Sequence, residues 1–230
     1  MTDRPYVLLK AAVSVDGYLD DSSAQRLLLS SPEDFAAVDE LRAGVDAILV
    51  GASTLRADNP RLMVRSAQLR QKRLADGLPE TPAKVTISRS IDLDPQLPFF
   101  TTGDCDKIVY VPDAAAGTAG QRLGAVAHIV GAGDPISLPK VLADLHRRGI
   151  RRLMIEGGST VHTQFLADGL VDEIRLSIAP FFVGDSSAPR LAGDAAFPFG
   201  SGRRMHLAQV SHEGDCVIVR YLLGEPADKP

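Results

Sequence analysis

IEGGSTVH, residues 155–162, is the most informative segment of the chain. The strand-like run RLMI at residues 152–155 leads into it, and its three apolar residues, 153–155, are typical of a buried strand. Two glycines then permit a tight turn in which the backbone can approach a ligand closely, and a helix begins at Ser159 or Thr160. The N-terminus of a helix offers free N–H groups and a positive dipole to a phosphate. The segment therefore indicates a strand–turn–helix unit whose glycines serve either a phosphate site or only the turn.

Similar apolar runs occur earlier in the chain and alternate with helical patterns. The strand-like runs are residues 6–15, 47–51, 85–87, 108–111 and 152–155. One helix begins after Ser31 as its N-cap, and another spans about residues 138–148. Strands that alternate with helices pair in parallel through crossover connections. The pattern predicts a three-layer α/β fold around a central parallel sheet.

The C-terminal part of the chain has a different pattern. Residues 174–178 alternate in polarity, and residues 207–211 and 216–222 flank a turn-forming HEGD segment. These features predict a strand followed by an antiparallel hairpin, so the sheet is expected to be mixed and mainly parallel. Residues 66–82 are polar and residues 185–202 are rich in Gly, Ala and Pro, and both segments are predicted to be loops.

Length and composition exclude several classes of protein. The 230 residues show no dividing linker, which favours one domain with an ordered core at about residues 4–223 and a flexible tail at 224–230. The net charge of −4 argues against nucleic-acid binding. No run approaches the roughly 18 apolar residues of a membrane span, and no signal core is present, so we expect a cytoplasmic protein. Two cysteines outside any Cys-x-x-Cys pair predict no metal site.

A second polar group follows the predicted strand at residues 47–51. Residues 54–65 read TLRADNPRLMVR, and Arg42 lies on the preceding helix. Ligands bind at the carboxyl ends of strands in open α/β sheets, and guanidinium groups suit phosphate. For any single arginine, a solvated surface position is the simpler interpretation. Because the histidines lack metal-ligand spacing and no Ser-His-Asp arrangement is visible, these residues indicate only a phosphate-binding α/β protein of unassigned chemistry.

Four blocks of the sequence resemble one known family. They are KAAVSVDG at residues 10–17, LRA at 41–43, residues 50–62, and IEGG at 155–158 with LVDEI at 170–174. In this order and spacing they resemble the reductase domain of the riboflavin pathway, the 5-amino-6-(5-phosphoribosylamino)uracil reductase, which is a relative of dihydrofolate reductase. The resemblance covers about residues 4–223. The His-x-Glu and Pro-Cys-x-x-Cys motifs of the deaminase that is often fused to this domain are absent, so a stand-alone reductase domain is expected.

The resemblance implies NADPH as the cofactor. The positions that match its phosphate site are Gly157, Gly158, Ser159, Thr160, Val161 and Gln164. Ala12, Thr54 and Asp58 match positions on the nicotinamide side of the cofactor. Ser88 and Arg89 match the approach to the adenosine 2′-phosphate, where an arginine favours NADPH over NADH.

The resemblance also implies a phosphorylated pyrimidine substrate. Arg42, Leu62 and Arg65 match the site of its phosphate, and Glu156 matches a carboxylate that contacts it. In the implied reaction, hydride transfer to ribose C1 converts the ring-opened phosphoribosylamine into a ribitylamine. Ring opening needs a proton, and a developing iminium favours a nearby carboxylate. The candidate catalytic residues are Lys10, Glu156 and Asp58, and which of them acts as acid or as base is left open.

One departure from the family pattern concerns the substrate. Where the family usually has Ser-Gly-x-Ser-x-Trp, this chain has Arg26 at the hydroxyl position and Leu28 at the aromatic one. Arg26 either adds a contact to the substrate phosphate or fills the space of the pyrimidine or ribose. The predicted function is a reductase of the 5-amino-6-(5-phosphoribosylamino)uracil reductase type, and these two positions favour a pathway-related but altered specificity. The alternatives are a related reductase with a different substrate, including dihydrofolate, and a protein that binds NADPH without catalysis. The resemblance also implies a homodimer, because members of this family are dimers in which exposed edge strands are covered by the partner.

Overall fold

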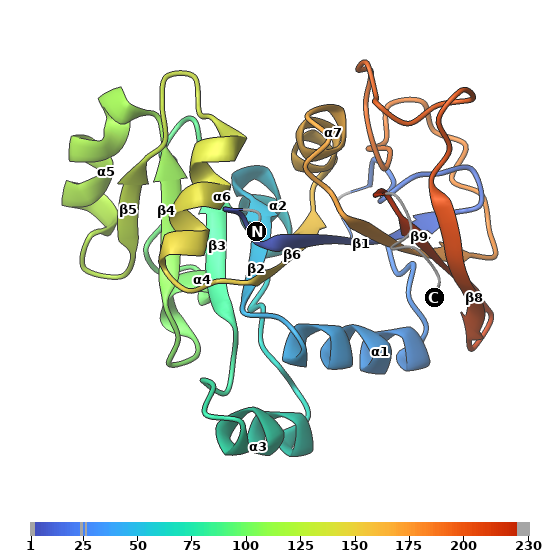
Figure 1. Cartoon of the computed structure of the whole chain (residues 1–230), viewed down its shortest axis with the longest axis horizontal. Coiled ribbons are helices and arrows are strands. Elements are labelled where there is room, and N and C mark those ends of the chain that lie inside the picture. Colours follow the sequence, from blue (N-terminus) through green and yellow to red (C-terminus); the bar gives the residue numbers. More distant parts are fainter. Residues whose placement is uncertain (1–2, 24, 26, 225–230) are drawn as a thin grey trace. The chain divides into compact units, whose positions relative to one another are not determined.

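The computed structural model describes residues 3–23, 25 and 27–224, and the chain forms two compact units (Figure 1). The first unit contains Val38–Met154 and the N-terminal segment that ends at Pro5. The second contains Tyr6–Ala37 and the chain from Ile155 onward. Helix α1 (Pro32–Ala43) and strand β6 (Arg152–Gly157) each run from one unit into the other.

A parallel sheet forms the centre of the first unit, with its strands in the order β5-β4-β3-β2. Every residue of β2 is buried, which explains why its sequence is a continuous apolar run without alternation. The strands are β2 (Ala47–Gly51), β3 (Ala83–Ile87), β4 (Lys107–Val111) and β5 (His128–Gly131). The helices are α2 (Ala52–Asp58), α3 (Ala67–Ala75), α4 (Pro98–Thr101), the 3₁₀ helix η1 (Asp113–Ala115), α5 (Ala116–Leu123) and α6 (Leu138–Arg147).

The second unit has a mixed sheet in the order β1-β7-β9-β8. Its strands are β1 (Tyr6–Ser14), β7 (Glu173–Ala179), β8 (His206–Glu213) and β9 (Cys216–Leu222), and its further helix is α7 (Ser159–Ala167). Strands β1 and β7 are parallel, whereas β9 is antiparallel to both β7 and β8. The β8–β9 pair is the hairpin that the HEGD turn predicted. The predicted α/β class, the mixed and mainly parallel pairing and the C-terminal hairpin are therefore confirmed.

Local signals placed the helix starts correctly. The Ser31 hydroxyl accepts a hydrogen bond from the Asp34 amide at 3.1 Å, which is the N-cap contact expected at the start of α1. Helix α6 covers the segment predicted as a helix at residues 138–148. The single domain remains a prediction, and most of the predicted tail, residues 225–230, lies outside the described residues. Within the described part of the chain, no helix is long and apolar enough to cross a membrane.

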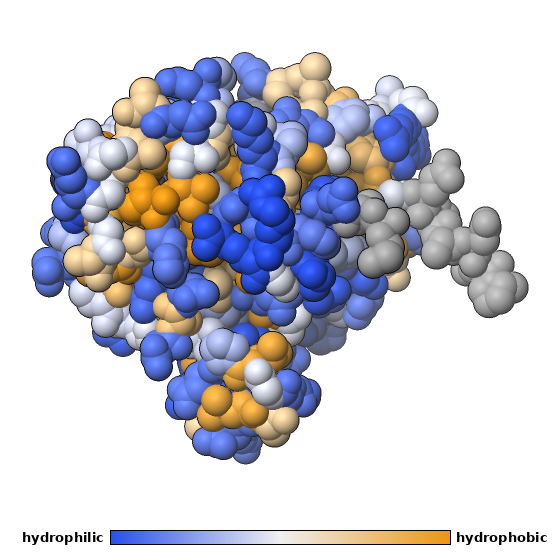
Figure 2. All heavy atoms as spheres, turned by 60° about the vertical axis from the view of Figure 1, so that its left-hand side comes forward, coloured by the Kyte–Doolittle hydropathy of each residue, from blue (hydrophilic) through white to orange (hydrophobic). Residues whose placement is uncertain are grey.

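The prediction of a loop throughout residues 66–82 is wrong, because helix α3 occupies most of this segment. Ser66 caps the helix by accepting a hydrogen bond from the Leu69 amide at 3.3 Å. The side chain of Arg73 is buried and donates to the carbonyls of Ala43, Val45 and Pro79 at 2.7–2.9 Å. The helix is thus held by a buried cation and not by an apolar stripe, and some of its apolar atoms are exposed on the surface (Figure 2).

Candidate active site

A buried polar cluster lies on one face of the mixed sheet, around Lys10 of β1. Its ammonium donates to the Asp34 carboxylate, with Nζ 3.1 Å from Oδ1, and to the hydroxyl of Ser177. Ser177 on β7 donates in turn to the same Asp34 oxygen at 2.6 Å. Lys10 is 6% exposed, Asp34 1% and Ser177 0%. The three side chains therefore form a closed network that excludes most water.

Burial and charge act in opposite directions on this network. Burial lowers the pKa of Lys10, and the carboxylates of Asp34 and Glu156 partly counteract that effect. Burial alone would raise the pKa of Asp34, but the Lys10 charge and the Ser177 hydroxyl outweigh it and leave the pKa below its ordinary value. The arrangement stabilises a charged lysine–carboxylate pair in a position where an isolated lysine would lose its proton easily.

Glu156 stands at the carboxyl end of β6, directly before the two glycines, and is half-buried. Its charge acts on Lys10 by raising the lysine pKa, so the structure brings together these two predicted catalytic residues. Ala12 lies two residues after Lys10 on the same face of β1 and pairs with Ser177 in the sheet register. The second unit thus places the Lys10 ammonium within electrostatic reach of the Glu156 carboxylate, which directly precedes the glycine turn.

The backbone of the glycine turn is open to close approach by a ligand. Gly157 has φ of 149°, a region that side chains other than glycine rarely adopt, and the Gly157–Gly158 peptide is cis. Gly158 is the N-cap of α7 and makes no side-chain cap hydrogen bond, so the first amides of this helix have no such partner. The predicted helix start at Ser159 is confirmed. Farther along α7, His162 is fully buried, which lowers its pKa to about 4, and its Nδ1 lies 3.2 Å from the Leu191 carbonyl.

In the first unit, a second group of predicted residues surrounds the segment that follows α2. The Asp39 carboxylate accepts hydrogen bonds from the amides of Arg65 and Ser66, both at 2.7 Å. Arg42, one helical turn farther along α1, donates to the Met63 carbonyl at 3.1 Å. Leu62 is buried with φ of 49°. The structure therefore brings Arg42 into contact with the backbone of the segment that carries Leu62 and Arg65.

The remaining residues predicted for the cofactor lie at the carboxyl ends of β2 and β3. Thr54 and Asp58 are four residues apart on α2, and so they share one face of this helix. Ser88 follows β3 and is buried, and its hydroxyl has no hydrogen-bond partner among the described residues. Arg89, the next residue, is exposed. A buried hydroxyl without a partner beside an exposed arginine is a suitable arrangement for an anionic ligand.

Comparison with known proteins decides the family. A family model described as the RibD C-terminal domain matches residues 5–219, nearly the whole chain. The chain belongs to the RibD C-terminal domain family. The resemblance inferred from the sequence is therefore confirmed.

Several known proteins are similar to this member of the RibD C-terminal domain family over most of their length. The 2,5-diamino-6-ribosylamino-4(3H)-pyrimidinone 5′-phosphate reductase of Archaeoglobus fulgidus is 37% identical over 195 residues, 84% of this chain and 89% of that protein. The protein of the same name from Methanothermobacter thermautotrophicus is 34% identical over 221 residues, 95% of this chain and 98% of that protein. A pyrimidine reductase-like protein from Corynebacterium diphtheriae has the same fold, with a TM-score of 0.77, 24% identity and coverage of 95% of this chain and 91% of that chain.

Arg26 and Leu28 are the two positions at which the sequence departs from the RibD C-terminal domain pattern, and the structure describes only the second. Arg26 lies outside the described residues. Leu28 is 70% exposed, so its side chain has little packing where the family pattern has an aromatic ring. Nearby, the Leu27 amide donates to the Asp20 carboxylate at 2.9 Å, which holds the backbone of this segment.

Sequence reasoning missed three side chains that hold the predicted site residues. Asp34 and Ser177 bind Lys10, and Asp39 binds the backbone at Arg65. The local sequence pattern gave a signal only for Asp39. This residue precedes Arg42 by three positions, so the two side chains lie on the same face of helix α1. Ser177 is 167 residues from Lys10, and no local pattern indicates that contact.

Proposed function

We propose that this chain is the NADPH-dependent reductase of riboflavin biosynthesis that acts on 2,5-diamino-6-ribosylamino-4(3H)-pyrimidinone 5′-phosphate. The observation that carries the proposal is the buried Lys10–Asp34–Ser177 network with Glu156 beside the glycine turn. Three relatives at 34–37% identity are named as reductases of that compound, which keeps an amino group where the uracil form has a carbonyl. We propose that residues 1–230 act as one reductase domain in the cytoplasm.

The residues present fit a dinucleotide with an additional phosphate. In the second unit, the amides at the start of α7 and the φ of Gly157 favour a phosphate held by backbone. In the first unit, the unpartnered Ser88 hydroxyl and the exposed Arg89 are suited to bind a 2′-phosphate. Thr54 and Asp58, which share one face of α2, would contact the nicotinamide side of the cofactor. When bound, NADPH supplies the hydride. The chain supplies orientation and charge placement.

Each catalytic candidate has a role that its environment favours. The Lys10 ammonium donates a proton toward the ribose ring oxygen as the ring opens, because its network stabilises the charged form. The Glu156 carboxylate stabilises the positive charge that develops at C1. Asp58 binds on the nicotinamide side, and Arg42 and Arg65 bind the substrate phosphate while Leu62 shapes that segment.

The proposed function is tested by NADPH oxidation with the purified chain and a small panel of substrates. We expect turnover with the 2,5-diamino compound, slower turnover with 5-amino-6-(5-phosphoribosylamino)uracil, and none with dihydrofolate. Equal turnover of both pyrimidines would show that the chain does not distinguish the 2-amino group. NADPH binding without oxidation of any panel member would refute the proposal and support a non-catalytic NADPH-binding protein.

Replacing Arg65 with alanine should raise the KM for the phosphorylated pyrimidine by about 10- to 150-fold and leave the KM for NADPH almost unchanged. The reason is the loss of one charge-assisted contact to phosphate, worth roughly 1.5–3 kcal/mol. Steady-state kinetics with each substrate varied in turn measure both constants. Lys72→Ala removes a cation from neighbouring α3, where Lys72 pairs with Asp76 at 2.6 Å, and serves as the control. A loss of NADPH affinity in Arg65→Ala would instead assign this arginine to the cofactor.

We propose that the chain forms a homodimer through the C-terminal hairpin. Strand β8 is at the edge of the mixed sheet, and large apolar side chains on the hairpin are exposed: Leu207 by 50%, Val210 by 59% and Val217 by 43%. Exposed apolar edge strands are normally covered. Sedimentation should give twice the chain mass at micromolar concentration, and Val210→Lys should shift it toward the monomer. A monomer in the unmodified protein would contradict the proposal.

A further inference from the structure

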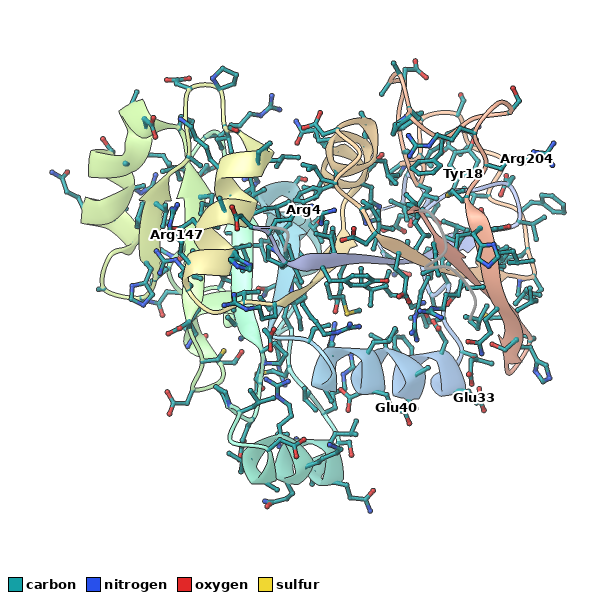
Figure 3. The ribbon with its side chains drawn as sticks, viewed as in Figure 1. Arg4, Tyr18, Glu33, Glu40, Arg147 and Arg204 are labelled. Carbon is teal, nitrogen blue, oxygen red and sulfur yellow. The ribbon has the colours of Figure 1, made fainter. Side chains whose placement is uncertain are left out.

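The side chain of Asp34 is directed inward by the first turn of α1. Ser31 caps this turn through the Asp34 amide, and its hydroxyl also donates to the Glu213 carbonyl at 3.1 Å. The cap is therefore tied to the turn of the β8–β9 hairpin. The preceding residue, Glu33, is exposed and lies on the side of α1 that points away from β1 (Figure 3). Two adjacent acids thus have opposite environments, and only Asp34 faces the sheet.

One oxygen of Asp34 carries the contacts to the network. Oδ1 accepts hydrogen bonds from the Lys10 ammonium at 3.1 Å and from the Ser177 hydroxyl at 2.6 Å. Oδ2 is buried and makes no hydrogen bond to the described residues, although the nearby Ser30 hydroxyl also helps to lower the pKa of this carboxyl. An asparagine with its oxygen at the Oδ1 position can accept the same two hydrogen bonds. Asp34→Asn therefore removes the charge while keeping the shape.

The other charged groups near Lys10 have different partners. Arg175 is in register with Lys10 on β7, and Arg220 is in register with Arg175 on β9. Both guanidinium groups bind the Glu173 carboxylate, at 2.6 Å for Arg175 and 2.8 Å for Arg220. Glu156 on β6 acts on Lys10 through its charge, whereas burial raises the pKa of the Cys216 thiol on β9, so this thiol is uncharged at neutral pH. Among the residues the structure describes, Asp34 is the carboxylate that contacts the Lys10 ammonium directly.

We infer that Asp34 is a positioning residue for the reductase: together with Ser177 it fixes the ammonium of Lys10 and keeps it charged. The inference about the charge of Lys10 rests on the network itself, and its importance for turnover rests on the proposed function. Without a carboxylate partner, a lysine that is almost fully buried loses its proton at lower pH, because burial disfavours the charged form. Asp34→Asn should therefore lower the ionisation midpoint of Lys10 by about 1–3 pH units. Above the new midpoint, a rate that needs the ammonium should fall about tenfold per pH unit.

The test measures the proton on Lys10 and the rate separately, in the full chain. The ¹³Cε shift of labelled lysines is titrated in the unmodified protein, Asp34→Asn and Glu33→Gln, with the Lys10 signal assigned by its absence in Lys10→Arg. The pH profile of kcat is recorded for the same proteins. We expect a lower midpoint in Asp34→Asn and an equal shift of the alkaline limb of kcat. Glu33→Gln removes the same charge from the same helical turn on the exposed face and should leave both measurements unchanged.

The outcomes separate the inference from the proposed function. An unchanged Lys10 midpoint in Asp34→Asn would overturn the inference, even if kcat fell. A lower midpoint with no shift of the kcat limb would support the control of the Lys10 charge by Asp34 and refute the proposed role of Lys10 in turnover. If Asp34→Asn does not fold, Ser177→Ala gives the same test, because it removes the shared hydroxyl and keeps both charges, and should lower the midpoint by a smaller amount. Asp34→Glu retains the carboxylate, so its Lys10 midpoint should lie close to that of the unmodified protein.

Discussion

Replacing Lys10 with methionine should lower kcat by about 10²- to 10⁴-fold, the range typical of losing a general acid or base. Lys10 is the ammonium placed beside Glu156 and held by Asp34 and Ser177, and methionine keeps most of the length of its side chain while removing the charged, proton-donating group. The KM for NADPH should change little, because the cofactor candidates on α7 and α2 are unaltered. Steady-state NADPH oxidation measures both constants.

The control for this loss must separate chemistry from stability. Lys10→Met leaves the buried Asp34 carboxylate without its cation, which should destabilise the protein by about 3–5 kcal/mol. The double variant Lys10→Met/Asp34→Asn removes that unpaired charge and should recover most of the stability. Its kcat should nevertheless stay as low as that of the single variant. Recovery of kcat together with stability would show that Lys10 has only a structural role.

The second large effect concerns Glu173, which should contribute about 3 kcal/mol to the free energy of unfolding at neutral pH. Its buried carboxylate accepts hydrogen bonds from Arg175, from Arg220 and, at 2.8 Å, from the Tyr6 hydroxyl. Burial alone would raise the pKa of Glu173, but these donors outweigh it and lower the pKa from 4.5 to about 2. Burial and the same contact with Glu173 raise the pKa of Tyr6 to about 12. Glu173→Gln should lose the corresponding stability.

The sign of the pH dependence follows from the lowered pKa. A carboxyl group whose pKa is lower in the folded state stabilises the protein above its unfolded pKa and loses that contribution as the pH falls through the folded value. The difference in unfolding free energy between the unmodified protein and Glu173→Gln should therefore be constant above about pH 4.5 and shrink toward pH 2. Urea denaturation across this range measures it. Glu40→Gln, on the exposed side of α1, should show no such difference, and a pH-independent gap for Glu173→Gln would contradict the electrostatic explanation.

The amino-acid sequence by itself determined the elements whose stability is local. Continuous apolar runs predicted the buried strands β2 and β4, because a strand covered on both faces has no polar alternation. Ser31 predicted the start of α1, and the glycines at 157 and 158 predicted the turn before α7, since caps and turns depend on neighbouring residues. The order of these elements predicted only the α/β class, and the family was predicted from the resemblance of the sequence blocks at residues 10–17, 41–43, 50–62, 155–158 and 170–174.

Only the tertiary structure decided which side chains hold the site. Arg73 stabilises α3 through carbonyls up to 30 residues away, so its segment looked like a polar loop in the sequence. Asp34 reaches Lys10 across 24 residues and Ser177 reaches it across 167, whereas Glu33, the neighbour of Asp34, is exposed beside the hairpin turn at Gly214. Such contacts depend on which faces of α1, β1 and β7 meet after the chain has closed long loops. A local pattern carries no information on that pairing, because a buried acid and an exposed acid one residue apart have the same sequence signature.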